Sequence, residues 1–342
     1  MRKILKIGMI GAGRIAYVHI KKVNESRAAR VTAIADPKIE LARGLASEFD
    51  IPDAFPDYRN ILEDATIDAV IVCSPTSTHA DICMEAARAG KHIFCEKPVD
   101  QSVEKILETI DVIKKSGVKM QIGFNRRFDH NYTRIRDLAR TGRLGDIKMV
   151  KITSREPESP PVDFIPTSGG LLLDMAIHDI DMARFQAGSE IAEVYAQGGV
   201  LVDPAIGEAG DIDTALMSLT FENGAFGVIE CCRKTSYGFD QRVEVFGTKG
   251  MALADNDRLT NVQLAMEDGV LLDKTPFFFL ERYDETFGVE IRAFIECVLE
   301  DRPVPVTIED GLRPVVVAYA AMRSMKEHRP VRPDEILQIF HR

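Results

Sequence analysis

The first 124 residues alternate short apolar runs with amphipathic segments. The apolar runs, which predict buried strands, are residues 4–10, 30–35, 68–74, 91–96 and 118–124. The segments whose apolar positions recur with the helical period are 14–24, 38–49, 78–89 and 103–116. Strands that are separated by helices pair in parallel, and the helices cover both faces of the sheet. The pattern therefore predicts an α/β domain with a doubly wound parallel sheet over residues 1–124.

From residue 125 the pattern changes to strands at hairpin spacing. A helix is predicted over 125–142, a strand over 146–154 and a Pro-rich loop over 155–170. The later strand runs are 193–202, 213–221, 224–232 and 241–254, with a hairpin turn at Asn223-Gly224, and helices are predicted over 286–299 and 310–326. Hairpin spacing predicts antiparallel pairing. Residues 125–342 are therefore predicted to form an α+β domain with a large, mainly antiparallel open sheet.

The stretch GGLLLDMAIHDIDMARF, residues 169–185, predicts a helix that is apolar almost all round but holds acids and a histidine. At 100° per residue, Asp174, His178 and Asp181 lie within about 60° of one another. Such a stripe has a matching partner in the core or lines a polar cavity. The alternatives are a satisfied core Asp–His pair, a general base with its orienting acid, or a three-donor metal site. No other His or Cys pattern supports the metal.

Composition and charge exclude several classes of function. The chain has 342 residues, 45% of them hydrophobic, which is enough for two cores. Its net charge is -10, and Lys and Arg are scattered among acids, which argues against nucleic-acid binding. No apolar run approaches the roughly 20 residues of a membrane span, and no signal peptide is evident. The six cysteines form no CxxC pair, so we interpret them as reduced residues of a cytoplasmic protein.

A glycine motif, GAGRIA, lies between the first predicted strand and the first predicted helix. It fits the pattern G-x-G-x-x-G/A, in which Gly11 allows a tight turn and Gly13 lets the backbone approach a pyrophosphate. Ala16 is small enough for close helix packing. The helix N-terminus, with Arg14 and Ile15 in its first turn, then faces the anion. The motif alone could mark a plain strand–turn–helix, but its context predicts a dinucleotide-binding, Rossmann-type domain.

An acid ends the second predicted strand and bears on the choice of cofactor. Asp36 follows the glycine motif by about 20 residues, where a carboxylate accepts hydrogen bonds from ribose hydroxyls. Its charge disfavours a 2′-phosphate, whereas the nearby Lys38 and Arg14 soften this repulsion. NAD is therefore the predicted cofactor, with NADP as a weaker second.

Two loops follow strands at the edge where ligands of open α/β sheets bind. Ser74, Thr78 and His79 follow the third strand and are candidates to contact the cofactor, although a surface or capping role is the simpler interpretation of His79. Glu96 and Lys97 follow the fourth strand. Lys97 is placed to stabilise the alkoxide that forms when a hydroxyl is oxidised. The alternative is a Glu–Lys pair on the surface.

Together these motifs resemble the glucose–fructose oxidoreductase, inositol dehydrogenase and MocA family, and within it the inositol 2-dehydrogenases. The similar stretches span nearly the whole chain and include GMIGAGRIAYVHI, FCEKPVD, GFNRRFD, residues 152–185 and YGFDQRVEVFGTKG. The resemblance implies an NAD-dependent enzyme that oxidises a ring hydroxyl of a cyclic polyol, such as myo-inositol to 2-keto-myo-inositol. It also implies that the open sheet of the second domain supports a homotetramer.

The resemblance further implies roles for individual residues. Lys97, Asp174 and His178 match a catalytic set, in which His178 is the base and Asp174 orients it and binds a hydroxyl. Lys97 either polarises the reacting oxygen or joins a proton relay. The positions that match polyol contacts are Asn125, Arg126, Asp181 and Tyr237. Structural roles are the alternatives for three of these: an ion pair for Arg126, a network for Asp181 and a half-buried strand position for Tyr237.

The sequence departs from the family pattern in two stretches near the predicted substrate entrance. Glu156 stands where this branch commonly has Asp, and residues 231–242 contain cysteines and Lys-Thr in place of a more Ser- and Arg-rich version. Neither change removes a proposed catalytic group. They leave open another substrate, such as scyllo-inositol, D-chiro-inositol or an aldose. A non-catalytic NAD(H)-binding regulator and a metal-dependent enzyme are the further alternatives.

Overall fold

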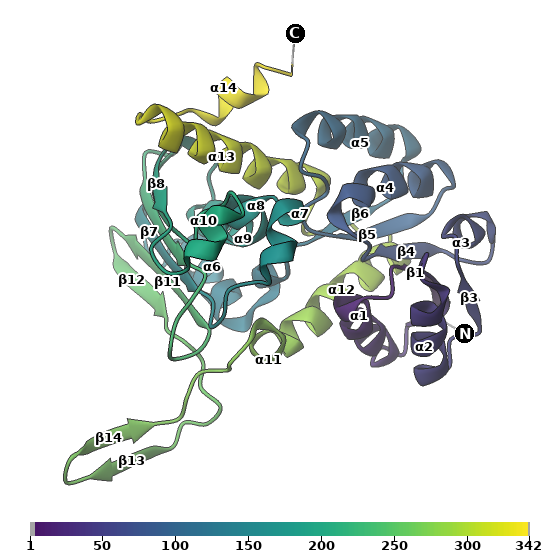
Figure 1. The fold of residues 1–342 in the computed structure, drawn as a ribbon, viewed down its shortest axis with the longest axis horizontal. Coiled ribbons are helices and arrows are strands. Elements are labelled where there is room, and N and C mark those ends of the chain that lie inside the picture. The colour runs from purple at the N-terminus through teal and green to yellow at the C-terminus, as the bar shows by residue number, and fades with distance from the viewer. Residues whose placement is uncertain (1–3, 341–342) are drawn as a thin grey trace. The chain divides into compact units, whose positions relative to one another are not determined.

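The computed structural model describes residues 4–340, which divide into two compact units (Figure 1). Unit 1 comprises the residues up to Phe128 together with Glu285–Arg313. Unit 2 comprises Asp129–Asp284 together with the residues from Pro314 onward. The division predicted at residue 124 therefore differs from this one mainly in the segment 285–313. That segment returns to unit 1 because apolar side chains of its helix pack in the core of unit 1.

Unit 1 contains a six-stranded parallel sheet in the order β3-β2-β1-β4-β5-β6. Its strands are β1 (Leu5–Ile10), β2 (Ala29–Ala35), β3 (Asp53–Phe55), β4 (Ala69–Val72), β5 (His92–Glu96) and β6 (Met120–Gly123). Its helices are α1 (Arg14–Asn24), α2 (Ile39–Glu48), α3 (Arg59–Glu63), α4 (His79–Arg88), α5 (Val103–Ser116) and α12 (Asp284–Leu299). The predicted parallel sheet is confirmed. β3 and α3 were not predicted because they are too short to show a period.

Helices cover both faces of this sheet, as the continuous apolar strands require. Leu5, Ile7 and Met9 alternate along β1 and pack in one core cluster with α1, α2 and α12. On the opposite face, Cys95 of β5 meets Cys83 of α4 through their thiols. Burial raises the pKa of the Cys95 thiol well above its ordinary value, so it stays protonated and unreactive.

Unit 2 contains a mixed, mainly antiparallel sheet in the order β12-β11-β7-β10-β9-β8, as predicted. The strands are β7 (Ile147–Arg155), β8 (Ile191–Gly199), β9 (Thr214–Phe221), β10 (Phe226–Cys232), β11 (Asp240–Gly247) and β12 (Gly250–Ala254). The helices are α6 (His130–Arg140), α7 (Ile165–Ser168), α8 (Gly170–Asp174), α9 (Ala176–Ala187), α10 (Pro204–Glu208), α11 (Phe279–Arg282) and α14 (Pro333–Leu337). α13 (Ile308–Glu327) begins in unit 1 and continues in unit 2. Within this sheet, as far as residues 4–340 describe it, β7 and β10 are the one pair that is parallel.

The hairpin turn predicted at Asn223-Gly224 is confirmed. It joins the antiparallel strands β9 and β10, and Gly224 has φ 81°, which a residue with a side chain rarely adopts. The side chain of Asn223 also accepts a hydrogen bond from the backbone of Ala225 at 3.0 Å. These two residues supply the local geometry that the turn needs.

Three predicted elements differ from the structure, and in two of them side chains form hydrogen bonds with the backbone. The helix predicted from residue 125 is a 3-10 helix, η2 (Asn125–Phe128), followed by α6. Asp129 caps α6 by accepting from the backbone of Asn131 and Tyr132 at 3.0 and 3.2 Å. The strand predicted to residue 202 ends at Gly199, since Asp213 accepts from the three backbone N–H groups of residues 201–203. The Pro-rich loop contains α7 and the 3-10 helix η3 (Val162–Phe164).

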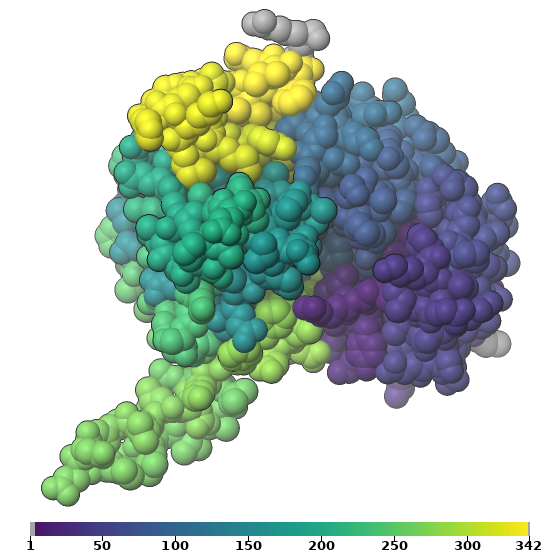
Figure 2. Space-filling view, viewed as in Figure 1, coloured from purple at the N-terminus to yellow at the C-terminus, as the bar shows by residue number. Residues whose placement is uncertain are grey.

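A two-stranded hairpin, β13 (Gln263–Met266) and β14 (Gly269–Leu272), extends from unit 2 as a narrow arm (Figures 1 and 2). Every side chain of both strands is exposed, including Leu264, Met266 and Leu271. An isolated two-stranded hairpin is marginally stable in water. The sequence analysis missed this arm.

A buried carboxyl group is the least expected feature of the core of unit 1. Glu290 of α12 is 0% exposed, and neither of its carboxyl oxygens has a hydrogen-bond partner in the described part of the chain. Beside it, the His19 ring of α1 bonds to Glu96 with 2.7 Å between Nε2 and Oε1. Burial and the charge of Glu96 raise the pKa of Glu290 well above its ordinary value. Glu290 is therefore held as a neutral acid.

This burial predicts that Glu290→Gln makes folding less sensitive to pH. Below pH 4.5 the Glu290 carboxyl is protonated in the folded and the unfolded chain, and no stability is lost. Above that pH the unfolded chain ionises first. The wild type should therefore lose up to about 1.4 kcal/mol of unfolding free energy per pH unit relative to the variant. Urea unfolding between pH 4 and pH 8 measures this difference.

Glu335→Gln is the matched control for this experiment. Hydrogen bonds from Arg329 lower the pKa of Glu335 to about 2, so its contribution is complete above pH 5 and is lost only in acid. Its difference from wild type should stay constant between pH 6 and pH 8. A Glu290→Gln difference that is equally constant over that range would contradict the neutral-acid assignment.

Candidate active site

The turn after β1 has room only for glycine at its first position. Gly11 has φ 96°, and a Cβ there would lie 2.7 Å from the backbone carbonyl of Cys73. Its N–H donates to the carbonyl of Ala35 at 2.8 Å. The backbones of β1, β2 and β4 therefore converge at this turn, and a side chain would force them apart.

The second glycine of the motif faces open space instead. Gly13 is the N-cap of α1, and a Cβ built there meets nothing within 4 Å. No side chain caps α1, and no acid lies in its first turn, which begins with exposed Arg14 and half-buried Ile15. Ala16 is fully buried against the core. Free N–H groups, open space and no negative charge fit the pyrophosphate of a dinucleotide.

Asp36 ends β2 beside this turn, as the motif predicts. Its carboxylate accepts from the backbone of Ala12 at 2.9 Å and from that of Lys38 at 2.8 Å. A carboxylate has about four acceptor positions, so two protein bonds leave room for ribose hydroxyls. The same side chain therefore holds the glycine turn in shape and presents acceptors at its edge.

The loop after β4 is tied to the loop after β5 by His79. Its Nε2 lies 2.7 Å from the carbonyl of Ser74, and its Nδ1 lies 2.8 Å from the carbonyl of Pro98. The ring is 2% exposed, so the interpretation of His79 as a surface residue was wrong. The hydroxyls of Ser74 and Thr78 bond to each other at 2.7 Å across the 3-10 helix η1 (Thr76–Thr78).

Lys97 follows β5, next to a carboxylate that points inward. The partner of Glu96 is the buried ring of His19, so the alternative of an exposed Glu–Lys pair does not hold. Lys97 is half-buried and precedes a cis peptide bond to Pro98. At the end of unit 1, Asn125 and Arg126 lie in η2 and are 5% and 7% exposed. These two buried polar residues therefore follow the carboxyl end of β6, at the same edge of the unit 1 sheet as Lys97.

The helix predicted over residues 169–185 is interrupted in unit 2. α8 ends at Asp174 and α9 starts at Ala176, with Met175 between them at φ -95° and ψ -60°. Met175 is itself in the right-handed helical region, and its N–H donates to the carbonyl of Leu171 at 3.1 Å, so the backbone stays helical across this irregularity. The apolar character is confirmed, since α9 is buried on nearly all sides.

The three ionisable residues of this segment have different surroundings. Asp174 is 24% exposed and bonds to Nη1 of Arg233 at 3.3 Å. His178 is half-buried in the first turn of α9. Asp181 is fully buried and pairs with Arg184, which also binds Glu190. Asp174 and His178 are thus reachable by a ligand, while Asp181 is part of an internal network.

Arg233 was not identified from the sequence. It follows β10 and is 1% exposed, the largest side chain buried so completely among residues 4–340. Arginines are mostly exposed, so nothing in the local pattern CCRK signals burial. The one signal for a buried arginine was the number of acidic residues in and around the helical segment, which need a cation when they are buried.

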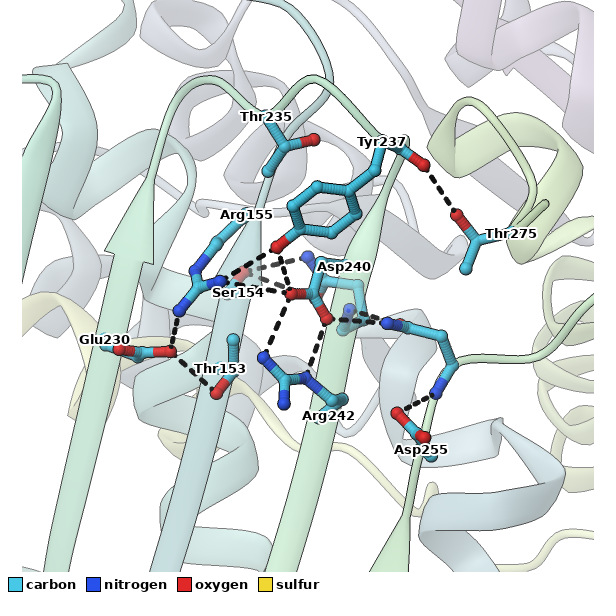
Figure 3. A network of polar contacts seen from close by, with 12 residues as sticks. Thr153, Ser154, Arg155, Glu230, Thr235, Tyr237, Asp240, Arg242, Asp255 and Thr275 are labelled. Carbon is cyan, nitrogen blue, oxygen red and sulfur yellow. Dashed lines mark hydrogen bonds and ion pairs between the residues drawn. The ribbon is translucent and has the colours of Figure 1, made fainter. Parts of the chain in front are cut away.

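Tyr237 lies in a separate polar network, shown in Figure 3. Its hydroxyl donates to Asp240 at 2.7 Å and accepts from Arg155 at 2.8 Å. Arg155 and Asp240 are register partners on β7 and β11, and they alternate with residues that face α9, so they point to the other face. Burial raises the pKa of Tyr237, and the hydrogen bond to Asp240 adds to this, so the phenol stays neutral.

The described residues can also be compared with the requirements of a metal site and of a membrane-spanning helix. Among residues 4–340, one group of three potential ligands is close enough to hold an ion: Asp129, His130 and Asp257. Arg282 already pairs with both of its carboxylates, at 2.7 and 3.2 Å. Asp174, His178 and Asp181 form no such group in this range. No helix in the same range is long and apolar enough to cross a bilayer.

Comparison with known families covers both units. Residues 5–124 match an oxidoreductase family described as an NAD-binding Rossmann fold, and residues 136–332 match the C-terminal alpha/beta domain of the same family. The chain belongs to the GFO/IDH/MocA oxidoreductase family. Membership confirms the resemblance drawn from the motifs, and it makes unit 1 an NAD-binding Rossmann domain.

Individual family members match over almost their full length. The chain is 47% identical over 331 residues to the uncharacterized oxidoreductase YrbE of Bacillus subtilis, covering 97% of each chain. It is 42% identical over 333 residues to the myo-inositol 2-dehydrogenase of Thermotoga maritima, covering 97% of this chain and 100% of the other. The crystal structure of scyllo-inositol dehydrogenase from Lactobacillus casei with bound NAD(H) and scyllo-inositol has a TM-score of 0.91 and 31% identity, covering 97% and 100%. The chain is therefore a member of the inositol dehydrogenase group of this family.

The open space at Gly13 predicts that Gly13→Asp removes cofactor binding without unfolding the chain. Asp is a favoured N-cap residue and would meet nothing within 4 Å, so unfolding free energy should change by less than about 1 kcal/mol. Its charge would repel a pyrophosphate, and NADH affinity, measured by fluorescence titration, should fall at least about tenfold. Gly13→Ser, which is neutral, should lose less. Equal NADH affinity in the wild type and Gly13→Asp would exclude this turn as the binding site.

Proposed function

We propose that this chain is an NAD-dependent dehydrogenase that oxidises a ring hydroxyl of a cyclic polyol, with myo-inositol to 2-keto-myo-inositol as the leading reaction. The observation that carries the proposal is an open dinucleotide turn in unit 1 together with an Asp174–His178 segment in unit 2 that is reachable from solvent. The inositol dehydrogenases among its relatives support the substrate class.

The residues that would hold the cofactor belong to unit 1. Backbone N–H groups of the Gly11–Gly13 turn and of the first turn of α1 would bind the pyrophosphate. Asp36 would accept from the ribose hydroxyls and repel a 2′-phosphate, which favours NAD over NADP. Ser74 and Thr78 would line the adjoining loop, which the buried ring of His79 keeps in place. When bound, the nicotinamide ring accepts the hydride that the substrate carbon loses.

The proton chemistry would fall to three side chains. His178 would take the proton of the reacting hydroxyl, a role that neutral imidazole suits near pH 7. Asp174, four residues before it, would orient the ring and hold a neighbouring hydroxyl. Lys97 would stabilise the negative charge that develops on the reacting oxygen.

Four further residues would contact the remaining hydroxyls. Asn125 and Arg126 are buried polar residues in η2. Asp181 is already paired with Arg184, and Tyr237 with Arg155 and Asp240, so these two can accept a polyol only beside existing bonds. We therefore expect Asn125 and Arg126 to contribute more to polyol affinity than Asp181 and Tyr237.

Another polyol of the same class is the second candidate substrate. The L. casei relative was crystallised with scyllo-inositol, which differs from myo-inositol only in the orientation of one hydroxyl. Glu156, the departure from the family pattern, lies 3.7 Å from the guanidinium that binds Asp174. Glu156 has a side chain one methylene longer than the Asp that is common in this branch. This difference beside the Arg233–Asp174 pair favours a shift in substrate preference.

We predict that the wild type reduces NAD with myo-inositol faster than NADP, and that Lys97→Met and His178→Ala lower kcat by about 10²- to 10⁴-fold. The measurement is the initial rate of NADH formation at 340 nm with myo-inositol, scyllo-inositol, D-chiro-inositol and glucose. NADH affinity of the His178→Ala variant should match that of the wild type, because unit 1 is unaltered.

Each outcome of this panel has a distinct meaning. A faster rate with scyllo-inositol or glucose would mean that the preferred substrate is another polyol or sugar of the same class. No rate with any substrate, together with tight NADH binding, would replace the enzyme with an NAD(H)-binding regulator. A rate abolished by EDTA would indicate a metal-dependent enzyme.

We also propose that the chain forms a cytoplasmic homo-oligomer, a tetramer by analogy with its family, through the face of the unit 2 sheet that helices leave uncovered. Met251, Phe246, Met149 and Phe226 are neighbours across β12, β11, β7 and β10. They are 52%, 48%, 37% and 58% exposed. A continuous apolar stripe of this kind marks an association surface. The exposed arm β13–β14 needs a partner for the same reason.

The double variant Phe226→Glu/Phe246→Glu should dissociate the oligomer, since four or more carboxylates would be buried without partners. Size-exclusion chromatography with light scattering should give a multiple of 38.0 kDa for the wild type and the monomer mass for the variant. Leu41→Glu on α2, where the wild-type side chain is 48% exposed, is the matched control and should leave the mass unchanged. A wild type of monomer mass would refute the proposal.

A further inference from the structure

One buried cation in unit 2 serves three carboxylates. Nη1 of Arg233 lies 3.3 Å from Oδ2 of Asp174 and 3.7 Å from Oε2 of Glu156. Its Nη2 lies 3.7 Å from Oδ2 of Asp211. Arg233 is 1% exposed, whereas the three acids are 12% to 26% exposed. The guanidinium is thus more deeply buried than the three carboxylates around it.

The backbone of Arg233 is held on both sides, so the origin of its side chain is well defined. Its own N–H donates to the carbonyl of Asp213 at 2.8 Å. The carbonyl of Cys232, the preceding residue, accepts from the N–H of Glu156 at 2.9 Å. The bond to Asp213 continues the antiparallel pairing of β10 with β9, and the bond from Glu156 continues the parallel pairing of β10 with β7. The two stretches that depart from the family pattern therefore meet at this residue.

Arg233 and Asp211 together hold both ends of the short helix α8. Asp211 accepts from the N–H of Leu171, in the first turn, with its two oxygens at 3.1 and 2.9 Å. Gly170 has φ 77°, and a Cβ there would lie 2.5 Å from an Asp211 oxygen, so glycine lets the acid approach. At the other end, Asp174 is bound by Arg233. Met175, the next residue, keeps a right-handed helical conformation, and its N–H donates to the carbonyl of Leu171 at 3.1 Å. The backbone therefore fixes the position of Asp174, whereas the direction of its carboxylate depends on the bond to Arg233.

We propose that Arg233 is a positioning residue that sets the orientation of the Asp174 carboxylate. The proposal rests on the proposed function, in which Asp174 orients His178. The backbone sets the position of Asp174, and the bond from the Arg233 guanidinium, at 3.3 Å, sets the direction of its carboxylate. Without it, the Asp174, Glu156 and Asp211 carboxylates would lose their common cation and repel one another.

Lysine replaces the charge of arginine but not its fork. The guanidinium spreads its charge over a plane, so that Nη1 can donate to Asp174 at 3.3 Å while Nη1 and Nη2 form ion pairs with Glu156 and Asp211 at 3.7 Å. A lysine ammonium is a single compact charge on a shorter side chain, so it cannot contact all three carboxylates in the same way. Arg233→Lys should therefore recover part of the function that Arg233→Met loses.

The kinetic test is a double-mutant cycle with NAD and myo-inositol. Arg233→Met should lower kcat about 100-fold, as expected for misplacement of a catalytic group, with NADH affinity unchanged. Arg233→Lys should lie between Arg233→Met and the wild type. In an Asp174→Asn background, Arg233→Met should lower kcat less than about threefold further, because its target is already altered. Independent losses that multiply in the double variant would overturn the proposal.

Arg282→Met is the matched control for loss of a buried arginine. Arg282 belongs to the same unit, is 8% exposed and pairs with Asp129 and Asp257, neither of which is a site candidate. It should lower the urea midpoint of unfolding but leave kcat within about threefold of the wild type. If Arg282→Met lowered kcat as much as Arg233→Met, the effect would be one of general stability and the proposal would fail.

A readout without activity separates this proposal from the proposed function. If the wild type oxidises none of the polyols, the proposed function fails, and urea midpoints of the same cycle decide the role of Arg233. Midpoints of Arg233→Met and Asp174→Asn that are less than additive in the double variant support a direct tie between the two side chains. Additive midpoints overturn it.

Discussion

Parallel pairing of β1 with β2 and β4 is the constraint on which the nucleotide site depends. It brings the carboxyl ends of these strands so close that Gly11 contacts the backbone of Cys73. The loops that follow the strands are then joined by specific bonds. Asp36 binds the glycine turn, and His79 links the carbonyls of Ser74 and Pro98. The place of Lys97 in unit 1 follows from these bonds.

In unit 2 the corresponding constraint is the cost of burying charge. A guanidinium removed from water needs anions around it, and Arg233 has three. The sheet makes this possible through its single parallel pair, β7–β10, which places Glu156 beside Cys232. The same residues that neutralise Arg233 include Asp174. The ion pairs that allow Arg233 to be buried therefore include the one that we propose orients Asp174.

Most of the fold could be predicted because its signals are local. Apolar runs separated by amphipathic helices define a parallel sheet, and Asn223-Gly224 defines a hairpin. The errors came where side chains compete with the backbone pattern. Asp129 starts α6 five residues later than the periodicity indicates, and Asp213 ends β8 early. The arm β13–β14 was missed because its apolar residues have no core to face.

The sequence by itself determined the glycine turn, the acid that follows β2, and the polar residues placed in an apolar segment, since each depends on neighbours along the chain. Only the tertiary structure decided that the helix is irregular at Met175, that His79 is buried between two loops, and that Arg233 is buried beside Asp174. The physical reason is distance along the chain. Asp174 and Arg233 are 59 positions apart, and only strand pairing makes one the neighbour of the other.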